Sequence, residues 1–437
     1  MKNRNLAILA AIAIGAIAAW PFFSHTQPVQ AAYIAPVLPD YAHRNDTIAF
    51  YEKRTRQHPQ DQVSASMLGG QYMQRYREDG DVSDIFRALH EAGVAIKLQP
   101  QNNAGAHETA GSAYTALHRF REALAQEQAA REDQPSDSNA PAQIASLDME
   151  LGRYDLAREN IRAAERIAQT PTVMAIRARY YELTGHLQSA RDLLAKATTL
   201  SDSVIDNSAQ GRAWFHFRQG EMAFSAGDVT TAKREERTAI AQFPNFEMAY
   251  RALARFCWAT KDWQCTREAA DRGIAIAPLP ETVGYKADAQ RATGDASGAR
   301  ESESLIFAIE RLGNAYHLSD RLLAVYYSDH RIRADDALRI AQREVTVRGD
   351  EIFAQDTLAW AAAMDGRWDV ARHAIAKAVR YNTQDPRIQF HAGVIALHFR
   401  DMPQARRRLQ SALALNSQFH PHYADQARSL LASIVRP

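Results

Sequence analysis

The fold is decided by a duplication close to the C-terminus. Residues 359–378 read AWAAAMDGRWDVARHAIAKA, and residues 393–412, about 34 residues further on, read GVIALHFRDMPQARRRLQSA. Each stretch is rich in helix-forming residues and is interrupted once, at Gly366 or near Arg400. The pattern predicts two copies of a short antiparallel helix pair. The small residues that match are Ala359 and Gly393, Ala371 and Ala405, and Ala378 and Ala412.

The same spacing extends over most of the chain. A small residue recurs at the place of Ala371, and most of the intervals are about 33 to 35 residues. Two helices that cross closely need a small side chain at the crossing, so each recurrence predicts one helix pair. Prolines at 100, 135, 244 and 278 fall where a unit ends and would stop a helix. The recurring residues are Ala88, Ala123, Ala157, Ala190, Ala232, Thr266, Ala299, Ala337, Ala371 and Ala405.

This period, with its small residues and unit-ending prolines, resembles the tetratricopeptide repeat (TPR) family from about Val63 to Asn416. The resemblance implies an all-α protein, a right-handed α-solenoid of about ten helix pairs. It also implies that the first helix of each pair lines a concave side, where such proteins bind their partners. Residues 420–435 have one apolar face and are expected to form a C-terminal capping helix.

Some segments depart from the period. The copies marked by Ala299 and Ala337 are weak. The interval from Ala190 to Ala232 is longer than the others and places extra residues at 201–210, in a loop or a lengthened helix. The first pair is expected to carry an insertion at 76–84, between its helices. A helix before the first pair is expected from residue 47 to residue 58, with Asp46 as its N-cap and Pro59 as its stop.

The N-terminal residues predict export. Two basic residues, Lys2 and Arg4, precede an apolar run at 6–23, and residues 29–31 (VQA) offer small residues at the spacing that a signal peptidase uses. The alternatives are an uncleaved inner-membrane tether through residues 6–23, near the minimum length for a span, and a cytoplasmic protein.

These observations divide the chain into three parts. We predict a signal peptide or N-terminal anchor at 1–31, a linker at 32–45 and the TPR solenoid at 46–437. The solenoid is then expected outside the cytoplasm, either periplasmic or secreted, or anchored to the membrane.

Composition and motifs exclude several function classes. The 437 residues are 46% hydrophobic and 24% charged, with a net charge of +1, which lacks the basic excess typical of a nucleic-acid binder. The sequence contains no phosphate loop, nucleophile elbow or HExxH motif. We therefore expect no enzymatic activity, no cofactor and no nucleic-acid partner.

The best candidate for a binding groove lies in the middle of the array. Positions that the family turns inward carry aromatic residues beside arginines, the types enriched at binding hot spots. Arg251 and Arg255 are four residues apart on one helix face and could hold a carboxylate or a peptide backbone. Alternatively, the aromatic side chains pack between neighbouring first helices, and the arginines are solvated or paired with Glu221. The candidates are Arg179, Trp214, Phe217, Glu221, Arg251, Arg255, Trp258 and Arg291.

The two cysteines, Cys257 and Cys265, fall in the two helices of one predicted pair. In an exported chain a disulfide between them is one interpretation, and two buried thiols are the alternative that the sequence leaves open. A third ligand for zinc is missing nearby, and the histidine pairs at 391/398 and 420/422 lack the spacing of a metal motif, so we expect no metal.

The sequence therefore predicts a non-enzymatic protein–protein interaction scaffold of the cell envelope, which binds a protein or peptide along its concave groove. The alternative is an accessory or regulatory subunit of an envelope enzyme, a secretion complex or a polymer-export complex. Both interpretations depend on analogy at the level of the fold.

Overall fold

The computed structural model describes residues 39–204, 207–315 and 321–435. The predicted signal or anchor at 1–31, which includes the tether at 6–23, and residues 32–38 of the predicted linker lie outside the described residues. Among the helices of the described ranges, none combines the length and the apolar character that crossing a membrane requires.

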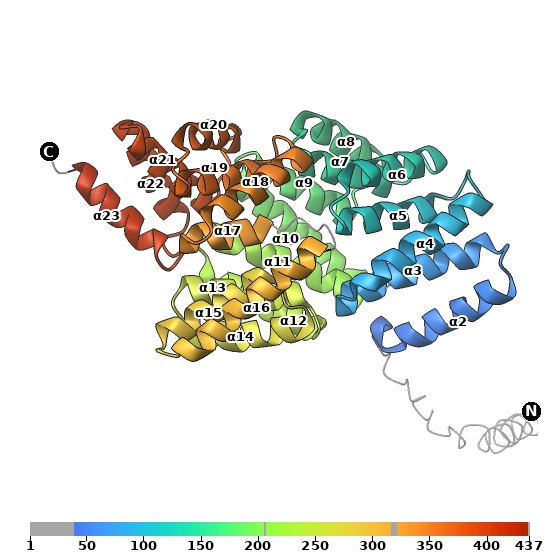
Figure 1. The fold of residues 1–437 in the computed structure, drawn as a ribbon. Helices are drawn as coiled ribbons and strands as arrows, with labels where there is room; N and C mark the ends of the chain where they lie inside the picture. The colour runs from blue at the N-terminus through green and yellow to red at the C-terminus, as the bar shows by residue number, and fades with distance from the viewer. Residues whose placement is uncertain (1–38, 205–206, 316–320, 436–437) are drawn as a thin grey trace, which may run out of the picture. The chain divides into compact units, whose positions relative to one another are not determined.

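The described part of the chain is helical throughout and contains no strand (Figure 1), which confirms the predicted fold class. Ten antiparallel helix pairs follow one another. They are α3 (Gln62–Asp79) with α4 (Val82–Leu98), α5 (Ala104–Ala116) with α6 (Phe120–Asp133), α7 (Asn139–Glu150) with α8 (Tyr154–Ile167), α9 (Pro171–Leu183) with α10 (Leu187–Ser203), α11 (Ala209–Ser225) with α12 (Val229–Gln242), α13 (Glu247–Ala259) with α14 (Trp263–Ile276), α15 (Pro280–Ala292) with α16 (Ala296–Ala315), α17 (Arg321–His330) with α18 (Ala334–Arg348), α19 (Ile352–Met364) with α20 (Trp368–Ala378), and α21 (Pro386–His398) with α22 (Met402–Leu415).

Two flanking elements complete the array. A 3-10 turn, η1 (Asp40–His43), and helix α2 (Arg44–Gln57) precede the first pair, and α2 packs against α3. At the other end, α23 (Tyr423–Val435) packs against α22 and is the predicted capping helix.

The recurring small residues explain the pairing. Nine of the ten are fully buried at 0% exposure, and Ala299 is 3% exposed, because each sits where the two helices of its pair cross. Several second helices begin with an aspartate N-cap, whose carboxylate accepts a backbone N–H three residues on. Asp228 caps α12, Asp262 caps α14 and Asp401 caps α22. The repeating pattern thus determines both the pairs and their starts.

The first helices form the inner layer. Successive first helices contact one another, α3 with α5, α7 with α9, and each of α11 to α19 with the next first helix. In the described ranges, no contact of comparable extent joins one second helix to the next. Helices lie closer together on the concave side of a curved solenoid, so the first helices line that side.

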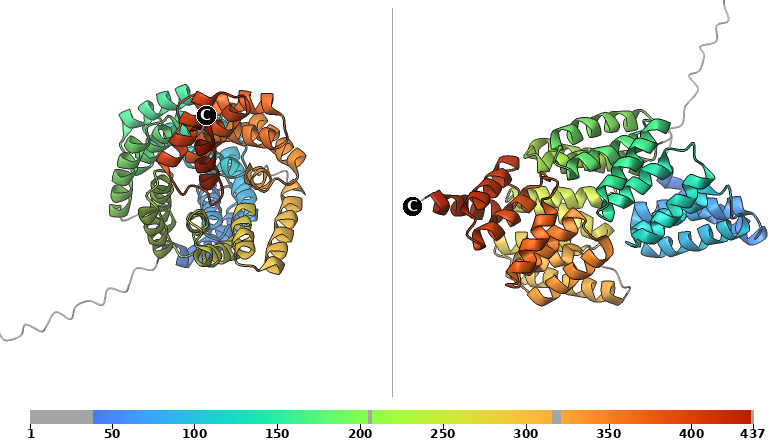
Figure 2. Two further views of the ribbon diagram at one scale, coloured as in Figure 1. Left: turned by 90° about the vertical axis from the view of Figure 1, so that its left-hand side faces the viewer. Right: turned by 90° about the horizontal axis from the view of Figure 1, so that it is seen from above.

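The helix pairs follow a superhelical path (Figure 2), and its second turn packs on the first. The hairpin turns at Gly152, Gly185 and Gly227 lie against the loops that precede α19, α21 and α23. A Cβ added at these three glycines would come within 2.4, 2.5 and 2.7 Å of backbone atoms of Asp350, Asn382 and Leu415. Each glycine also has φ between 69° and 80°. Glycine is therefore required at these turns both by backbone conformation and by the close approach of a segment from the next superhelical turn.

The structure corrects three details. The residues at 76–84 mostly lengthen α3 and α4 instead of forming an insertion between them. The extra residues near 201–210 lengthen α10 and α11 to 17 residues each, which confirms one of the two predicted alternatives. Helix α2 begins at Arg44, so Asp46 lies in its first turn and is not its cap. Residues 40–45, predicted as linker, are helical, because Arg44 pairs with Glu78 at 2.7 Å and Tyr41 packs on Phe243.

Candidate functional site on the concave surface

Ion pairs link neighbouring first helices along the middle of the concave surface. The Glu182 carboxylate of α9 accepts hydrogen bonds from Arg179 of its own helix and from Arg218 of α11, both at 2.8 Å. One helix further, Arg255 of α13 donates to Glu221 of α11 at 2.8 Å. These side chains are only partly exposed, between 14% and 30%.

The same row continues into α15. The guanidinium of Arg251 on α13 donates to Glu247 at 3.2 Å and to Glu281 of α15 at 3.1 Å. Burial alone would raise the pKa of Glu281, but Arg251 and Arg255 outweigh it and hold that pKa below its ordinary value. The pKa of Arg251 is raised in turn by Glu247 and Glu281, against the effect of burial. These hydrogen-bonded, charged groups hold one another in a fixed orientation.

Two of the predicted aromatic residues are buried. Trp258 is 4% exposed, and its indole N–H donates to Asp288 Oδ2 at 2.9 Å, while its ring packs on Tyr285 of the next first helix. Phe217 is 5% exposed and meets Phe246 edge to face. For these two side chains the structure agrees with the alternative interpretation, packing between neighbouring helices.

The other candidates remain partly accessible. Trp214 is half-buried and lies edge-on against Phe215. Arg291 is 46% exposed, donates to Asp288 at 2.8 Å and pairs with Glu303. Arg179 lies over the ring of Phe353 on α19, with its guanidinium carbon 5.2 Å from the ring centre. The structure brings Glu221, Arg251 and Arg255 together, whereas Arg179 and Arg291 belong to separate ion pairs; binding at these residues stays a prediction.

A second cluster was not found from the sequence. Asp329 on α17 accepts hydrogen bonds from Trp360 of α19 at 3.0 Å, Arg387 of α21 at 2.7 Å and Tyr423 of α23 at 2.9 Å. Burial would raise the pKa of Asp329, but Arg387 and His420 lower it well below its ordinary value. The four elements are thereby held together by one carboxylate.

This cluster borders a small, partly open pocket between α13, α15, α17 and α21, where the space not filled by protein atoms, open solvent included, is about 340 Å³. The wall includes Trp258, Tyr285, Tyr326 and His330 besides Asp329. Hydrogen bonding to Asp288 raises the pKa of His330 despite the opposing effect of burial. Sequence reasoning missed the pocket because α17 belongs to one of the weak copies, and because Asp329 and Arg387 are 58 residues apart.

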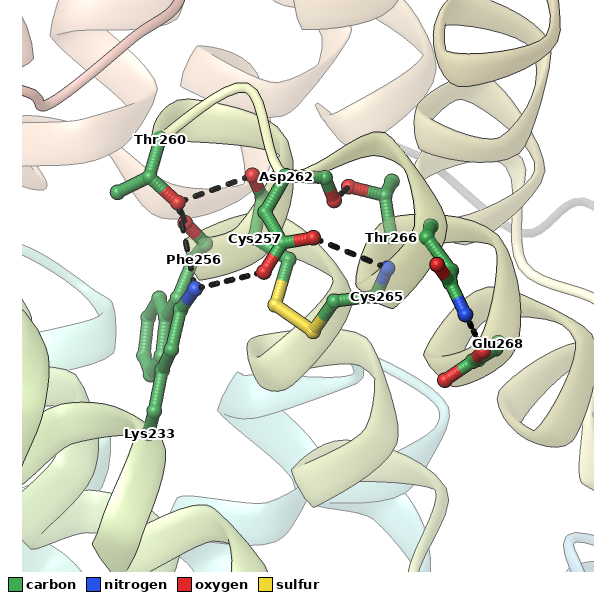
Figure 3. Close-up of a disulfide and its surroundings, with 9 residues drawn as sticks. Lys233, Phe256, Cys257, Thr260, Asp262, Cys265, Thr266 and Glu268 are labelled. Atoms are coloured by element: carbon green, nitrogen blue, oxygen red, sulfur yellow. Dashed lines mark hydrogen bonds and ion pairs between the residues drawn. A yellow bond between two sulfur atoms is a disulfide. The ribbon is translucent and has the colours of Figure 1, made fainter.

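The two cysteines form a disulfide that joins α13 to α14 (Figure 3), one of the two alternatives that the sequence left open. Their Cα atoms are 5.8 Å apart. Asp262 lies within 4.8 Å of the cysteine sulfurs, and its carboxylate accepts the Cys265 backbone N–H at 3.3 Å as the cap of α14. A disulfide offers no thiolate to a metal ion, so this group of three residues stabilises the hairpin instead.

Comparison with known proteins identifies a fold and no family. Neither the scan against protein-family models nor the search of curated proteins finds a match. Among solved structures, the human IFIT1 dimer with PPP-AAAA is 13% identical, covers 73% of this chain and 72% of that chain, and has a TM-score of 0.50. The human IFIT1 dimer with m7Gppp-AAAA is also 13% identical, covers 78% of this chain and 77% of that chain, and has a TM-score of 0.50. Yeast Tom70 is 11% identical, covers 85% of this chain and 95% of that chain, and has a TM-score of 0.36. The IFIT1 likeness shows a shared α-helical repeat solenoid of the TPR type.

Proposed function

We propose that the protein is a non-enzymatic interaction scaffold of the cell envelope, and that it binds a peptide segment of a partner protein along the first helices α9 to α15. The observation that carries this proposal is the row of charged side chains between Glu182 and Glu281. These groups are held in fixed orientations while they keep partial exposure. A surface ordered in advance loses little conformational entropy when a ligand binds.

The chemistry of this row suits a peptide. Arg251 and Arg255 present guanidinium groups that can donate to a carboxylate or to backbone carbonyls as a fork of N–H groups. Arg255 Nε is buried and makes no hydrogen bond with the described residues. The neighbouring carboxylates accept backbone N–H groups, so an extended chain finds both kinds of partner along one row.

Two features support placement in the envelope. The apolar run at residues 6–23 follows basic residues in the manner of an export signal or a tether. The disulfide between Cys257 and Cys265 is of the kind that persists in oxidising compartments outside the cytoplasm. The proposal thus includes an exported solenoid, either released or tethered by its N-terminus.

Co-purification from the envelope fraction tests the proposal. The informative variant exchanges charges, Glu221→Arg with Arg255→Glu, because it keeps the ion pair between α11 and α13 but reverses what the surface presents. The matched control is Arg237→Gln with Arg272→Gln, which changes two exposed arginines of the outer helices α12 and α14. We expect one defined protein to accompany the wild type and the control, and to be lost from the exchange variant.

Folding and nucleic acid are controlled separately. Circular dichroism and the melting temperature of the exchange variant should match the wild type, and nuclease treatment should leave the captured protein unchanged. If the exchange variant retains the partner, the middle of the concave surface is not the binding site. If no protein accompanies the wild type, the scaffold proposal itself fails.

A further inference from the structure

A second hollow of the concave layer lies between α5, α6 and α7, outside the row of ion pairs. It is partly open to solvent, and the space within it, open solvent included, is about 570 Å³. Its polar wall consists of three hydroxyl groups, one amide and two carboxyl groups, and the described residues that line it include no basic side chain. These polar wall residues are Ser112, Thr115, Gln143, Ser146, Glu127 and Glu150.

One of the carboxyl groups is buried with an unpaired oxygen. Glu127 is 3% exposed, and its Oε2 makes no hydrogen bond with the described residues. Room for it exists because the facing residue on α5 is Gly111, where a Cβ would lie 2.4 Å from Glu127 Oε1. At the equivalent place of the last pair, Gly393 faces the apolar side chain of Leu409. A carboxyl group in this position does not serve packing, and an unpaired buried polar group is destabilising.

The charged groups around Glu127 are mostly acidic. Helix α5 contributes Glu108, which is bonded to Asn139 at 2.9 Å, and α7 contributes Glu150 at the rim. Burial and then Glu108 raise the pKa of Glu127 to about 8. Arg348 of α18 reaches this rim and binds Glu150 Oε2. The wall therefore supplies many acceptors and already holds a guanidinium group at its edge.

We propose that this hollow binds the guanidinium group of an arginine side chain from the partner's peptide, with Glu127 and Glu150 as its carboxylate acceptors. A guanidinium carries five N–H donors, which match the carboxylates, the hydroxyl oxygens and the Gln143 carbonyl of the wall. The inference rests on the proposed scaffold function and names one residue type that its partner carries.

Binding should release a proton. Without a ligand, Glu127 keeps its proton at pH 7, and the incoming cation favours the ionised form. The released proton comes from the Glu127 carboxyl and passes to the buffer. A hollow that recognised its ligand only by shape or by neutral hydrogen bonds would release no proton on binding.

Titration calorimetry on the full chain tests the proposal with two peptides, acetyl-Ala-Arg-Ala-amide and the same peptide with citrulline, the uncharged analogue of arginine. We expect the arginine peptide to bind about tenfold or more tightly than the citrulline peptide, since charge-assisted hydrogen bonds are the stronger kind. Comparing buffers of different ionisation enthalpy at pH 7 should show close to one proton released per peptide.

Two matched variants complete the test. Glu127→Gln keeps the size of the side chain and cannot ionise, so it should abolish proton release and weaken the arginine peptide about tenfold. Glu236→Gln changes the equivalent buried glutamate of α12, which faces Gly220 and is not part of this hollow, and should bind as the wild type does. Equal binding of both peptides, or unchanged binding by Glu127→Gln, would overturn the inference.

The outcome is separable from that of the scaffold proposal. Peptide binding is measured on the isolated protein, whereas the scaffold is tested by capture of a partner. A captured partner with no arginine preference refutes only this inference. Arginine binding without any captured partner refutes only the scaffold.

Discussion

Carboxyl groups in two regions of the same solenoid behave in opposite ways. Along α9 to α17, Glu182, Glu281 and Asp329 face guanidinium groups, which lower their pKa values although burial acts in the other direction. In α6 and α12, Glu127 and Glu236 lie under a glycine of the facing helix with unpaired oxygens, and burial raises their pKa values. For these five acids a hydrogen-bonded guanidinium group, more than depth in the fold, sets the direction of the pKa shift, although burial still raises the pKa of Glu247 beside Arg251.

The acids with lowered pKa values and the acids with raised pKa values also have opposite effects on stability. A lowered carboxyl pKa adds stability that is complete above the unfolded pKa, near 4, and is lost as the pH falls. A raised carboxyl pKa removes stability progressively as the pH rises from about 4.5 towards the folded value. We therefore expect the free energy of unfolding to have its maximum in weakly acidic solution.

The largest loss of stability is expected from removing a carboxylate in the region where buried acids face guanidinium groups. Asp329→Ala removes the acceptor shared by Trp360, Arg387 and Tyr423, and it leaves the charge of Arg387 without its partner. Losing one partner of a buried ion pair costs about 3–5 kcal/mol. Urea denaturation at pH 7 measures this loss. Asp155→Ala, at an exposed ion pair on α8, is the control and should be indistinguishable from the wild type; similar losses in both would contradict the comparison.

The second region is tested by replacing its unpaired carboxyl groups with amides, which cannot ionise. The variant Glu127→Gln should gain about 3–4 kcal/mol in free energy of unfolding over the wild type as the pH rises from 5 to 8, because burial raises the pKa of Glu127 to about 8 and a tenfold change in a proton-binding constant between the folded and unfolded states is worth about 1.4 kcal/mol. Adding Glu236→Gln should change the pH dependence in the same direction. Urea denaturation at several pH values across that range measures how the free energy of unfolding changes with pH. Some decline with pH remains, since the raised pKa values of His216 and His330 also mean stability that is lost as the pH rises. A variant profile parallel to that of the wild type would refute the assignment.

The smallest effect is expected from a single ion pair in the row of charged side chains on the concave surface. A double-mutant cycle on Arg255→Gln and Glu221→Gln should give a coupling of about 1–2 kcal/mol, because the pair is mostly buried and spans two helices. The same cycle on Arg158 and Asp155, which are exposed within one helix, should give none that is measurable. Equal couplings would mean that solvent screens the concave surface as fully as it screens the exterior.

Much of the fold could be predicted because it repeats. The small residues at regular intervals are the buried crossing points, and they identified even the weak copies at Ala299 and Ala337 as helix pairs. The candidate site could be predicted in part. Arg255 with Glu221 was recognised as a potential pair, whereas the roles of Trp258 and Asp329 depend on partners in other repeats.

The sequence by itself determined the helix pairs, their order and the two cysteines that one hairpin brings together, because each depends on residues within one or two repeats. Only the tertiary structure decided which turns meet the next superhelical turn and which acids acquire a guanidinium neighbour. Gly152 and Gly185 look like ordinary turn glycines in the sequence, yet each must also admit the backbone of a distant repeat, at Asp350 and at Asn382. Such contacts depend on small rotations between successive pairs, which add up over a full turn and leave no periodic trace in the sequence.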